Sequence, residues 1–306
     1  MAEIEIIKYL RSKFPKKNKE IRVGIGDDGM IMKNNTVIST DSFAQGIHFD
    51  LKYFSMFALG CRTMGASLSD LAAMAAEPIC ALISLGLPRS TKTLQIKELY
   101  RGFAYVCNQF HCDISGGDII ESPILTITIT VVGKTRSPLM RSGAKPGDYL
   151  YTTGYLGLAE VGRIVLKEGY RRNQFPEAVK KHLYPEPRIY EAQRLRKYLS
   201  AGIDTSDGLS TDAHHLAEES CVRVLIEEIP IHPEVALLCS FKKISPIKFV
   251  LSAGEDFELL VAGKILYNLR NIKLFKIGRI LEGKGVYLLR NKTLKRIYPT
   301  GYEHLR

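Results

Sequence analysis

Acidic residues recur in this chain inside short segments of glycine, serine and threonine, and this pattern limits the possible functions more than any other feature. The segments are GIGDDG at 24–29, STDS at 39–42, SLSD ending at Asp70, GGD ending at Asp118, DTSDG at 204–208 and GED at 254–256. An aspartate beside glycine can approach a metal ion closely and leave space for phosphate oxygens. Because most segments follow apolar runs typical of strand ends, they predict a site for several Mg²⁺ ions and a nucleotide.

Length and local composition predict two domains. A chain of 306 residues is long enough for roughly two domains of ordinary size. The segment SPLMRSGAKPGD at 137–148 is rich in proline, glycine and charge, which is typical of a connection between domains. We therefore expect an N-terminal domain at 1–137 and a C-terminal domain at 138–306.

The pattern of apolar residues predicts a mixed α/β or α+β architecture in both halves. The segment ILTITITVVGK at 124–134 alternates threonine with apolar residues, which is typical of a strand with one wetter face. Further strands are predicted at 21–25, 36–40, 79–87, 149–153, 222–226, 249–251, 259–262 and 275–281. Helices are predicted at the N-terminus and at 53–76, 94–110 and 157–167, followed by a basic helical region that runs to residue 199. A strand, a turn and a helix are expected in succession at 202–219.

The excess of basic charge favours a solvated surface over a nucleic-acid interface. The chain has 43 lysine and arginine residues against 32 acids, and a net charge of +11. These basic residues are dispersed among predicted helices, without interleaved aromatic residues or a recognisable nucleic-acid motif. We expect no nucleic-acid partner, and anionic substrates are compatible with the same charge.

The sequence also predicts a cytoplasmic protein without a membrane partner. No run approaches the roughly 18 apolar residues that span a membrane. The N-terminal stretch MAEIEIIKYLRSKF interleaves apolar residues with charges, so it lacks the apolar core of a signal peptide. The six cysteines have no spacing typical of a disulfide framework, and we expect reduced thiols.

Ordered motifs extend across nearly the whole chain. They are GIGDDG, STDSFAQGIHF, LSDLAAMAAEP, SGGDI, RSGAKPGDYLYTTGYLG, IDTSDGLSTD, LSAGEDFELL and GYEH. Together they resemble the thiamine-monophosphate kinase family, which belongs to the aminoimidazole ribonucleotide synthetase superfamily. The resemblance implies transfer of the γ-phosphoryl group of ATP to thiamine monophosphate, which makes thiamine diphosphate. It also implies the two-domain fold of the superfamily, with an N-terminal sheet that pairs across a homodimer, a C-terminal α/β domain, and ATP and metals between the domains.

The resemblance assigns most of the acidic segments to Mg²⁺. The metal ligands that it implies are Asp27, Ser39, Thr40, Asp41, Asp70, Asp118, Asp204 and Asp207. Asp41, Asp118 and Asp207 are the expected catalytic members of this set, because loss of a carboxylate leaves phosphate charge insufficiently neutralised. The alternative for each aspartate is a hydrogen-bond acceptor in a turn or helix cap, and Asp70 taken alone favours the start of a helical turn.

The resemblance also implies a set of nucleotide contacts. The expected ATP-binding residues are Tyr100, Gly117, Asp118, Arg141 and Ser206. Gly117 would let the backbone approach phosphate, and Ser206 belongs to a predicted strand-to-helix junction where a helix N-terminus can hold phosphate. A loop arginine such as Arg141 is otherwise usually solvated, and no motif anchors Tyr100.

Three residues match the acceptor-binding positions of the family, namely His48 in QGIHF, Glu255 in AGEDFE and Tyr302 in GYEH. Tyr302 replaces the tryptophan that is usual there, and a tyrosine can still stack on a pyrimidine or thiazolium ring. Taken alone, His48 is more typical of a structural histidine, and Glu255 is equally typical of a turn. An aromatic residue this near the C-terminus is either an exposed tail residue or folded back over a site.

The implied chemistry needs positioning and charge neutralisation more than a strong base. By analogy with phosphorylated side chains, whose second pKa is about 6, the acceptor phosphate is mostly ionised at neutral pH. Direct in-line transfer assisted by Mg²⁺ is therefore expected. Two alternatives stay open: a sister ATP-dependent synthetase or kinase of the superfamily, and a sensor that binds ATP and Mg²⁺ without turnover.

Overall fold

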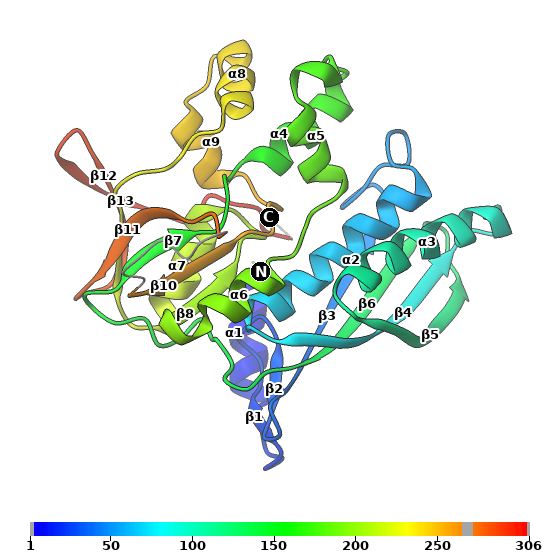
Figure 1. The fold of residues 1–306 in the computed structure, drawn as a ribbon, viewed down its shortest axis with the longest axis horizontal. Coiled ribbons are helices and arrows are strands. Elements are labelled where there is room, and N and C mark those ends of the chain that lie inside the picture. The colour runs from blue at the N-terminus through cyan, green and yellow to red at the C-terminus, as the bar shows by residue number, and fades with distance from the viewer. Residues whose placement is uncertain (1–2, 265–271, 305–306) are drawn as a thin grey trace.

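The computed structural model describes residues 3–264 and 272–304, which form two β-sheets with helices packed against them (Figure 1). The first sheet is built from the N-terminal half of the chain and the second from the C-terminal half. This arrangement confirms the mixed α/β fold class predicted from the sequence. None of the helices in the described ranges combines the length and the apolar character that crossing a membrane requires.

The first sheet has the strand order β1-β2-β3-β6-β4-β5. Its strands are β1 (Ile21–Val23), β2 (Met30–Met32), β3 (Thr36–Ala44), β4 (Glu77–Leu87), β5 (Asp113–Glu121) and β6 (Thr126–Lys134). Strands β4 and β5 are parallel, whereas the other neighbouring pairs are antiparallel.

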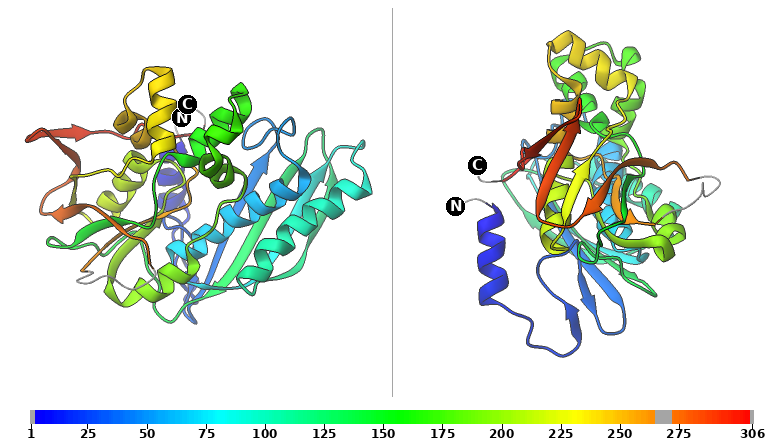
Figure 2. Two further views of the ribbon diagram at one scale, coloured as in Figure 1. Left: turned by 45° about the horizontal axis from the view of Figure 1, so that its top comes forward. Right: turned by 90° about the vertical axis from the view of Figure 1, so that its left-hand side faces the viewer.

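Two long helices, α2 (Met56–Ala73) and α3 (Thr93–Gln109), cover one face of this sheet (Figure 2, left). A β-carbon on Gly60 would come within 2.2 Å of the carbonyl oxygen of Leu99, so this glycine lets the two helix backbones touch. Along β6 buried side chains alternate with half-exposed ones, which confirms the predicted strand with one wetter face.

The second sheet has the strand order β13-β12-β9-β11-β7-β10-β8. Its strands are β7 (Tyr149–Thr152), β8 (Leu199–Asp204), β9 (Arg223–Ile226), β10 (Leu259–Gly263), β11 (Phe275–Leu281), β12 (Gly285–Arg290) and β13 (Thr293–Ile297). The helices of this half are α4 (Leu158–Glu168), α5 (Pro176–Leu183), α6 (Ile189–Leu195), α7 (Leu209–Glu219), α8 (Pro233–Lys242) and α9 (Pro246–Ser252), with 3₁₀ turns at Arg172–Gln174 and Arg196–Tyr198. Helix α1 (Glu3–Lys13) precedes β1, and its start lies beside the last described residues of the chain (Figure 2).

The buried apolar residues form two cores. The first lies between the first sheet and helices α2 and α3, and it also includes Leu139 and Leu195 from the second half. The second lies around the second sheet and includes Val161 of α4 and Leu216 of α7. Helix α6 packs against α2, so the two halves share an apolar contact. The domain boundary between 137 and 138 stays a prediction.

The strand predicted at 249–251 is wrong, because these residues belong to helix α9. Ser245 precedes the helix, and its hydroxyl accepts a hydrogen bond from the backbone of Lys248 at 3.5 Å. Pro246 occupies the first turn. A serine cap followed by proline is a helix-start signal that outweighs a short apolar run.

The sequence pattern also misplaced some acidic segments. STDS lies inside β3 and GGD lies inside β5, so neither is a turn. SLSD ends in the last turn of α2, so Asp70 does not begin a helix. Strands β2, β5, β12 and β13 and helix α8 were not predicted, because the apolar periodicity of their sequences is weak.

Candidate active site

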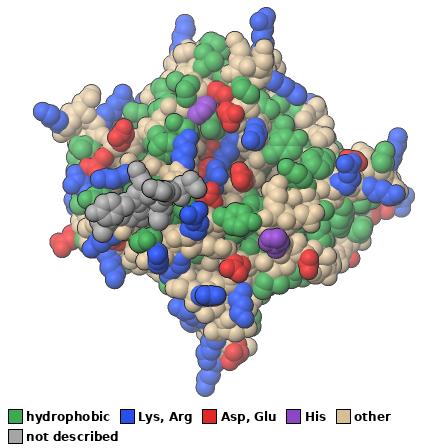
Figure 3. All heavy atoms as spheres, viewed as in Figure 1, with side chains coloured by type: hydrophobic (Ala, Val, Ile, Leu, Met, Phe, Trp, Pro, Cys, Tyr) green, Lys and Arg blue, Asp and Glu red, His purple; other side chains and the backbone are tan. Residues whose placement is uncertain are grey.

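Three aspartates from distant parts of the chain meet where the two halves of the molecule join. Asp28 lies just before β2, Asp70 in the last turn of α2, and Asp204 at the end of β8. One carboxylate oxygen of each lies within 4.8 Å of the others. We call Asp28, Asp70 and Asp204 the acidic centre. On the face shown in Figure 3, acidic side chains lie among lysine and arginine side chains near the middle of the molecule.

Hydrogen bonds fix one oxygen of each aspartate in the acidic centre. The hydroxyl of Ser39 donates to Asp70 at 2.5 Å, and the hydroxyl of Ser69 donates to Asp204 at 2.6 Å. Arg141 pairs with Oδ1 of Asp28 at 2.6 Å. The remaining oxygen of Asp28, Oδ2, is buried and has no hydrogen-bond partner among the described residues. A buried carboxylate oxygen without a partner is costly, which indicates a place for a cation.

The acidic centre has raised pKa values because its members are buried together. Burial, with the nearby charge of Asp28, raises the pKa of Asp204 to about 8. Burial and the charges of neighbouring carboxylates raise the pKa of Asp70 well above its ordinary value. Like charges crowded in a low dielectric resist full ionisation until an opposite charge arrives. The donors are oxygens only, which fits a hard divalent cation such as Mg²⁺.

Asp27 and Asp41 adjoin the acidic centre. Both carboxylate oxygens of Asp27 accept a bond from the backbone of Arg141 at 3.3 Å. Burial and the neighbouring Asp28 charge raise the pKa of Asp27 to about 7. Burial raises the pKa of Asp41, and the charge of Asp41 contributes to the raised pKa of Asp70. Thr40 alternates with Asp41 along β3, and its hydroxyl bonds to Thr130 at 3.0 Å on the other face of the sheet.

The turn after β8 brings Ser206 and Asp207 beside the same region. Asp212 in α7 organises this turn, because its carboxylate accepts from the backbone of Gly208 at 3.0 Å and of Asp207 at 3.4 Å. Burial, together with the charge of Glu3 in α1, raises the pKa of Asp207 to about 6. The carbonyl of Ser206 accepts from the backbone of Glu255 at 2.8 Å, so this turn is joined to the AGEDFE loop.

Glu255 is held in a strained conformation by a buried arginine. Its φ is +64°, in the left-handed region that non-glycine residues seldom adopt. Arg62 of α2 is 2% exposed and pairs with Glu255 at 2.7 Å. The same guanidinium donates to the carbonyl of His182 at 2.6 Å. The strained backbone conformation of Glu255 is thus stabilised by its ion pair with Arg62, which joins the two halves of the molecule.

His48 and Tyr302 are linked through the C-terminal tail, residues 300–304. The ring centre of His48 lies 5.2 Å from that of His304, which lies 4.8 Å from that of Tyr302. Burial and the His304 charge lower the pKa of His48. The backbone of Tyr302 donates to the carbonyl of Asp207 at 2.9 Å, while its side chain is 52% exposed. The tail is therefore folded back on the Asp207 turn, and the tyrosine ring faces outward.

Three predicted nucleotide contacts lie elsewhere in the chain. Asp118 and Gly117 are in β5, the edge strand of the first sheet, with β6 and β4 between it and β3. A β-carbon on Gly117 would come within 1.7 Å of the carbonyl oxygen of Ile83, so the close approach of β4 requires this glycine. Tyr100 lies on α3 with its ring 5.3 Å from that of Phe103. The structure does not bring these residues to the acidic centre of the same chain.

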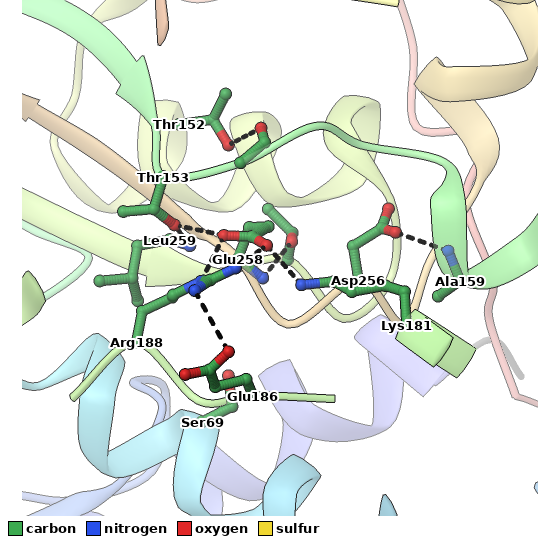
Figure 4. A network of polar contacts seen from close by, with 12 residues as sticks. Ser69, Thr152, Thr153, Ala159, Lys181, Glu186, Arg188, Asp256, Glu258 and Leu259 are labelled. Carbon is green, nitrogen blue, oxygen red and sulfur yellow. Dashed lines mark hydrogen bonds and ion pairs between the residues drawn. The ribbon is translucent and has the colours of Figure 1, made fainter. Parts of the chain in front are cut away.

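Glu258 forms a buried network that the sequence pattern did not reveal (Figure 4). It pairs with Lys181 and, at 2.7 Å, with Arg188. Thr153 also donates to it at 2.7 Å. Although burial opposes ionisation, these two cations lower the pKa of Glu258 to about 2. The neighbouring Asp256 accepts from the backbones of Gly157 and Ala159, so it caps α4.

Several residues of the site were missed because their signals are weak or non-local. Asp28 follows Asp27 in GIGDDG, and the pair of consecutive aspartates was the one feature of the sequence that could have indicated Asp28 as a ligand. Asp212 and Ser69 resemble ordinary helix residues, and nothing in the sequence pairs Arg62 with Glu255.

Comparison with known proteins finds similarity to one family over nearly the whole chain. Residues 26–135 match the family model described as AIR synthase related protein, N-terminal domain. The thiamine-monophosphate kinase of Aquifex aeolicus (strain VF5) is 33% identical over 297 residues, which cover 94% of this chain and 95% of that protein. The thiamine-monophosphate kinase of Bacillus subtilis (strain 168) is 30% identical over 313 residues, with 94% and 95% covered.

A solved structure agrees with these relatives. The structure of AaThiL complexed with AMPPCP and TMP is similar with a TM-score of 0.91 and 29% sequence identity, covering 99% of this chain and 97% of that chain. Sequence similarity and fold thus agree over nearly the whole length. The chain belongs to the thiamine-monophosphate kinase family.

Proposed function

We propose that this protein transfers the γ-phosphoryl group of ATP to thiamine monophosphate and releases thiamine diphosphate. The observation that carries the proposal is the buried acidic centre, which contains an unpaired Asp28 oxygen and whose Asp204 leads into the turn that holds the C-terminal aromatic tail. A hard-cation site next to an aromatic surface suits a polyphosphate and a heteroaromatic acceptor. The family relationship supports the same reaction, and the AaThiL complex contains an ATP analogue and TMP.

Mg²⁺ is the proposed metal, and its ligands come from the acidic centre and its neighbours. Asp28, Asp70 and Asp204 are the ligands that the geometry supports, and we add Asp27, Ser39, Thr40, Asp41, Asp118 and Asp207 from the resemblance. Because the hydroxyl of Thr40 bonds to Thr130 on the other face of the sheet, Thr40 would contribute its backbone carbonyl. When bound, the ions would neutralise the charge of the phosphates. Ser39, Ser69 and Arg141 would hold the carboxylates in place. Of the three proposed catalytic aspartates, Asp41 and Asp207 would act together with the acidic centre of their own chain. Asp118 lies on the edge strand β5.

A homodimer would explain the position of the remaining nucleotide contacts. Asp118 is on the edge strand, three strand spacings from β3, or roughly 14 Å at about 4.8 Å per strand. Its partner in β4 is Ser84, and the neighbouring side chains on that face include Leu82 at 42% and Ile120 at 57% exposure. An exposed apolar face and edge of this kind are suited to cover by a second copy. We propose that Tyr100, Gly117 and Asp118 contribute to the site of the partner subunit.

The remaining roles follow from charge and position. Arg141 and Ser206 would contact the nucleotide, and His48, Glu255 and Tyr302 would contact the acceptor. The ionised acceptor phosphate needs no side chain to remove a proton, so these residues would bind and orient it. We place the first domain at 1–137 and the second at 138–306, and we propose a cytoplasmic location without a nucleic-acid partner.

An assay of ATP consumption across acceptors tests the proposal. We expect turnover with thiamine monophosphate and Mg²⁺, and little with thiamine or without an acceptor. Turnover with another acceptor of the superfamily would favour a sister synthetase or kinase. ATP binding without consumption on any acceptor would favour a sensor.

A further inference from the structure

The side chain of Glu3, at the start of helix α1, contacts the C-terminal tail. The backbone amide of His304 donates to the carboxylate of Glu3 at 3.0 Å, across almost the entire sequence. Figure 2 shows the start of helix α1 near the last described residues of the chain in both views. Glu3 is half-buried, in contrast to the exposed residues Lys8 and Arg11 further along the same helix.

The tail that Glu3 holds follows a closely fitted path over the Asp207 turn. The backbone amides of Thr300, Gly301 and Tyr302 donate to Ser210, Thr211 and Asp207 at 3.1, 3.2 and 2.9 Å. A β-carbon on Gly301 would come within 2.0 Å of the carbonyl oxygen of Asp207. Hydrogen bonds from the backbone amides of the tail therefore hold it as far as Tyr302. Glu3 binds the tail two residues further on, at His304.

The contact between Glu3 and His304 also holds a ring that touches two of the proposed acceptor-binding residues. The His304 ring lies between His48 and Tyr302, and Nδ1 of His304 lies 3.4 Å from the Tyr302 hydroxyl. Because the amide and the ring belong to one residue, release of the amide frees the ring to leave both neighbours. The exposed Tyr302 ring would then lose the contact that orients it.

Other features of α1 do not account for this arrangement. Ile7, Leu10 and Phe14 have the helical spacing of a packed face, but they are exposed. The helix is joined to α7 by ion pairs of Lys8 with Glu218 at 3.5 Å and of Arg11 with Glu219 at 2.6 Å. Exposed pairs of this kind add little stability. The hydrogen bond between Glu3 and His304 is thus the contact of this helix that bears on the tail.

We infer that Glu3 is a positioning residue for the acceptor, which acts by holding His304 and Tyr302 in place next to His48. This role rests on the proposed function, since it assigns the acceptor side of the same site. Glu3 itself touches neither substrate. Its carboxylate accepts a hydrogen bond, so an uncharged acceptor at the same position should serve equally well.

The test compares Glu3→Ala with Glu3→Gln, and uses Lys8→Ala as the matched control on the same helix. We expect Glu3→Ala to raise the KM for thiamine monophosphate several-fold, with the KM for ATP and kcat within about twofold of wild type. Glu3→Gln should stay near wild type, because the amide oxygen can still accept from His304. Lys8→Ala should change neither KM. Equal effects of Glu3→Ala and Glu3→Gln, or of Lys8→Ala, would overturn the inference.

A double-variant cycle tests whether Glu3 acts through the tail. On a Tyr302→Ala background, Glu3→Ala should add no more than about twofold to the KM for thiamine monophosphate, because both changes remove one arrangement. Independent, multiplicative effects would contradict the inference. Hydrogen exchange of the amides at 301–304 gives a readout without substrate, and Glu3→Ala should accelerate it at least tenfold.

These measurements separate the two proposals. A wild-type protein that does not phosphorylate thiamine monophosphate rejects the proposed function, whatever the exchange rates are. An active wild type, with unchanged KM and unchanged exchange in Glu3→Ala, rejects the positioning role alone.

Discussion

The hydroxyl of Ser69 donates a 2.6 Å hydrogen bond to the carboxylate of Asp204 and thereby joins α2 to the end of β8. The two residues belong to different halves of the molecule, and both are buried. This bond aligns Asp204 with Asp70, the residue that follows Ser69. The acidic centre is therefore complete only when the two halves of the molecule are docked.

The first prediction concerns stability without metal. Asp204 and Asp27 have pKa values raised to about 8 and about 7, against about 4 in an unfolded chain. The folded protein then binds more protons than the unfolded chain, so the free energy of unfolding falls as pH rises through these values. His215, with a pKa lowered to about 4, acts in the opposite sense only below about 6.5.

Thermal unfolding in EDTA should therefore show a Tm that falls by roughly 2–4 °C between about pH 6.5 and 8. Mg²⁺ should raise the Tm more at pH 8 than at pH 6.5, because protons compete for the same oxygens. Asp204→Asn should weaken both dependences, because Asp27 still titrates, while the circular dichroism spectrum stays unchanged. A wild-type Tm in EDTA that rises over this pH range would argue against the shared burial of these carboxylates.

The second prediction tests whether Asp118 serves the partner subunit. Asp118→Asn and Asp204→Asn should each abolish most activity as homodimers. Mixing the two after dissociation should restore up to about a quarter of wild-type activity, since half of the random pairs carry one intact site. Each variant re-mixed with itself is the control. If the mixture stays inactive although hybrid dimers form, Asp118 acts within its own chain.

The third prediction concerns recognition of the acceptor. Tyr302→Ala should raise the KM for thiamine monophosphate by up to about tenfold, which corresponds to about 0.5–1.5 kcal/mol for an aromatic contact. The KM for ATP should stay nearly unchanged, and Tyr302→Trp should restore or improve acceptor binding. Steady-state kinetics with each substrate varied in turn would decide this, and a weakened ATP interaction alone would refute it.

The fourth prediction separates stability from catalysis. Glu258→Gln leaves Lys181 and Arg188 without their buried counter-ion, so it should lower the free energy of unfolding by about 3 kcal/mol. Glu168→Gln, which breaks an exposed pair with Lys242, should cost less than about 1 kcal/mol. Urea unfolding at pH 7 measures both. Similar values for the two variants would show that the Glu258 network is not a major contributor to stability.

Regular elements with strong periodicity were predictable from the sequence, and contacts between distant segments were not. The alternation at 124–134 predicted β6, and the long helical run near 53–76 predicted α2. The nine-residue strand β5 escaped prediction because it contains Gly116 and Gly117, and the close approach of β4 that requires Gly117 is not visible in any local pattern. The site shows the same difference. Asp70 and Asp204 lie in local motifs that predicted a metal site, whereas the roles of Ser69, Arg62 and Glu3 depend on contacts with distant segments that the sequence does not show.

The most direct test of the account is transfer of a labelled γ-phosphoryl group from ATP to thiamine monophosphate, with product identification by chromatography. Wild-type protein with Mg²⁺ should form labelled thiamine diphosphate, and Asp204→Asn should reduce its rate at least 100-fold while remaining folded, because it removes one carboxylate of the acidic centre. Absence of labelled thiamine diphosphate from the wild type, or a folded Asp204→Asn variant that forms it at near wild-type rate, would contradict the account.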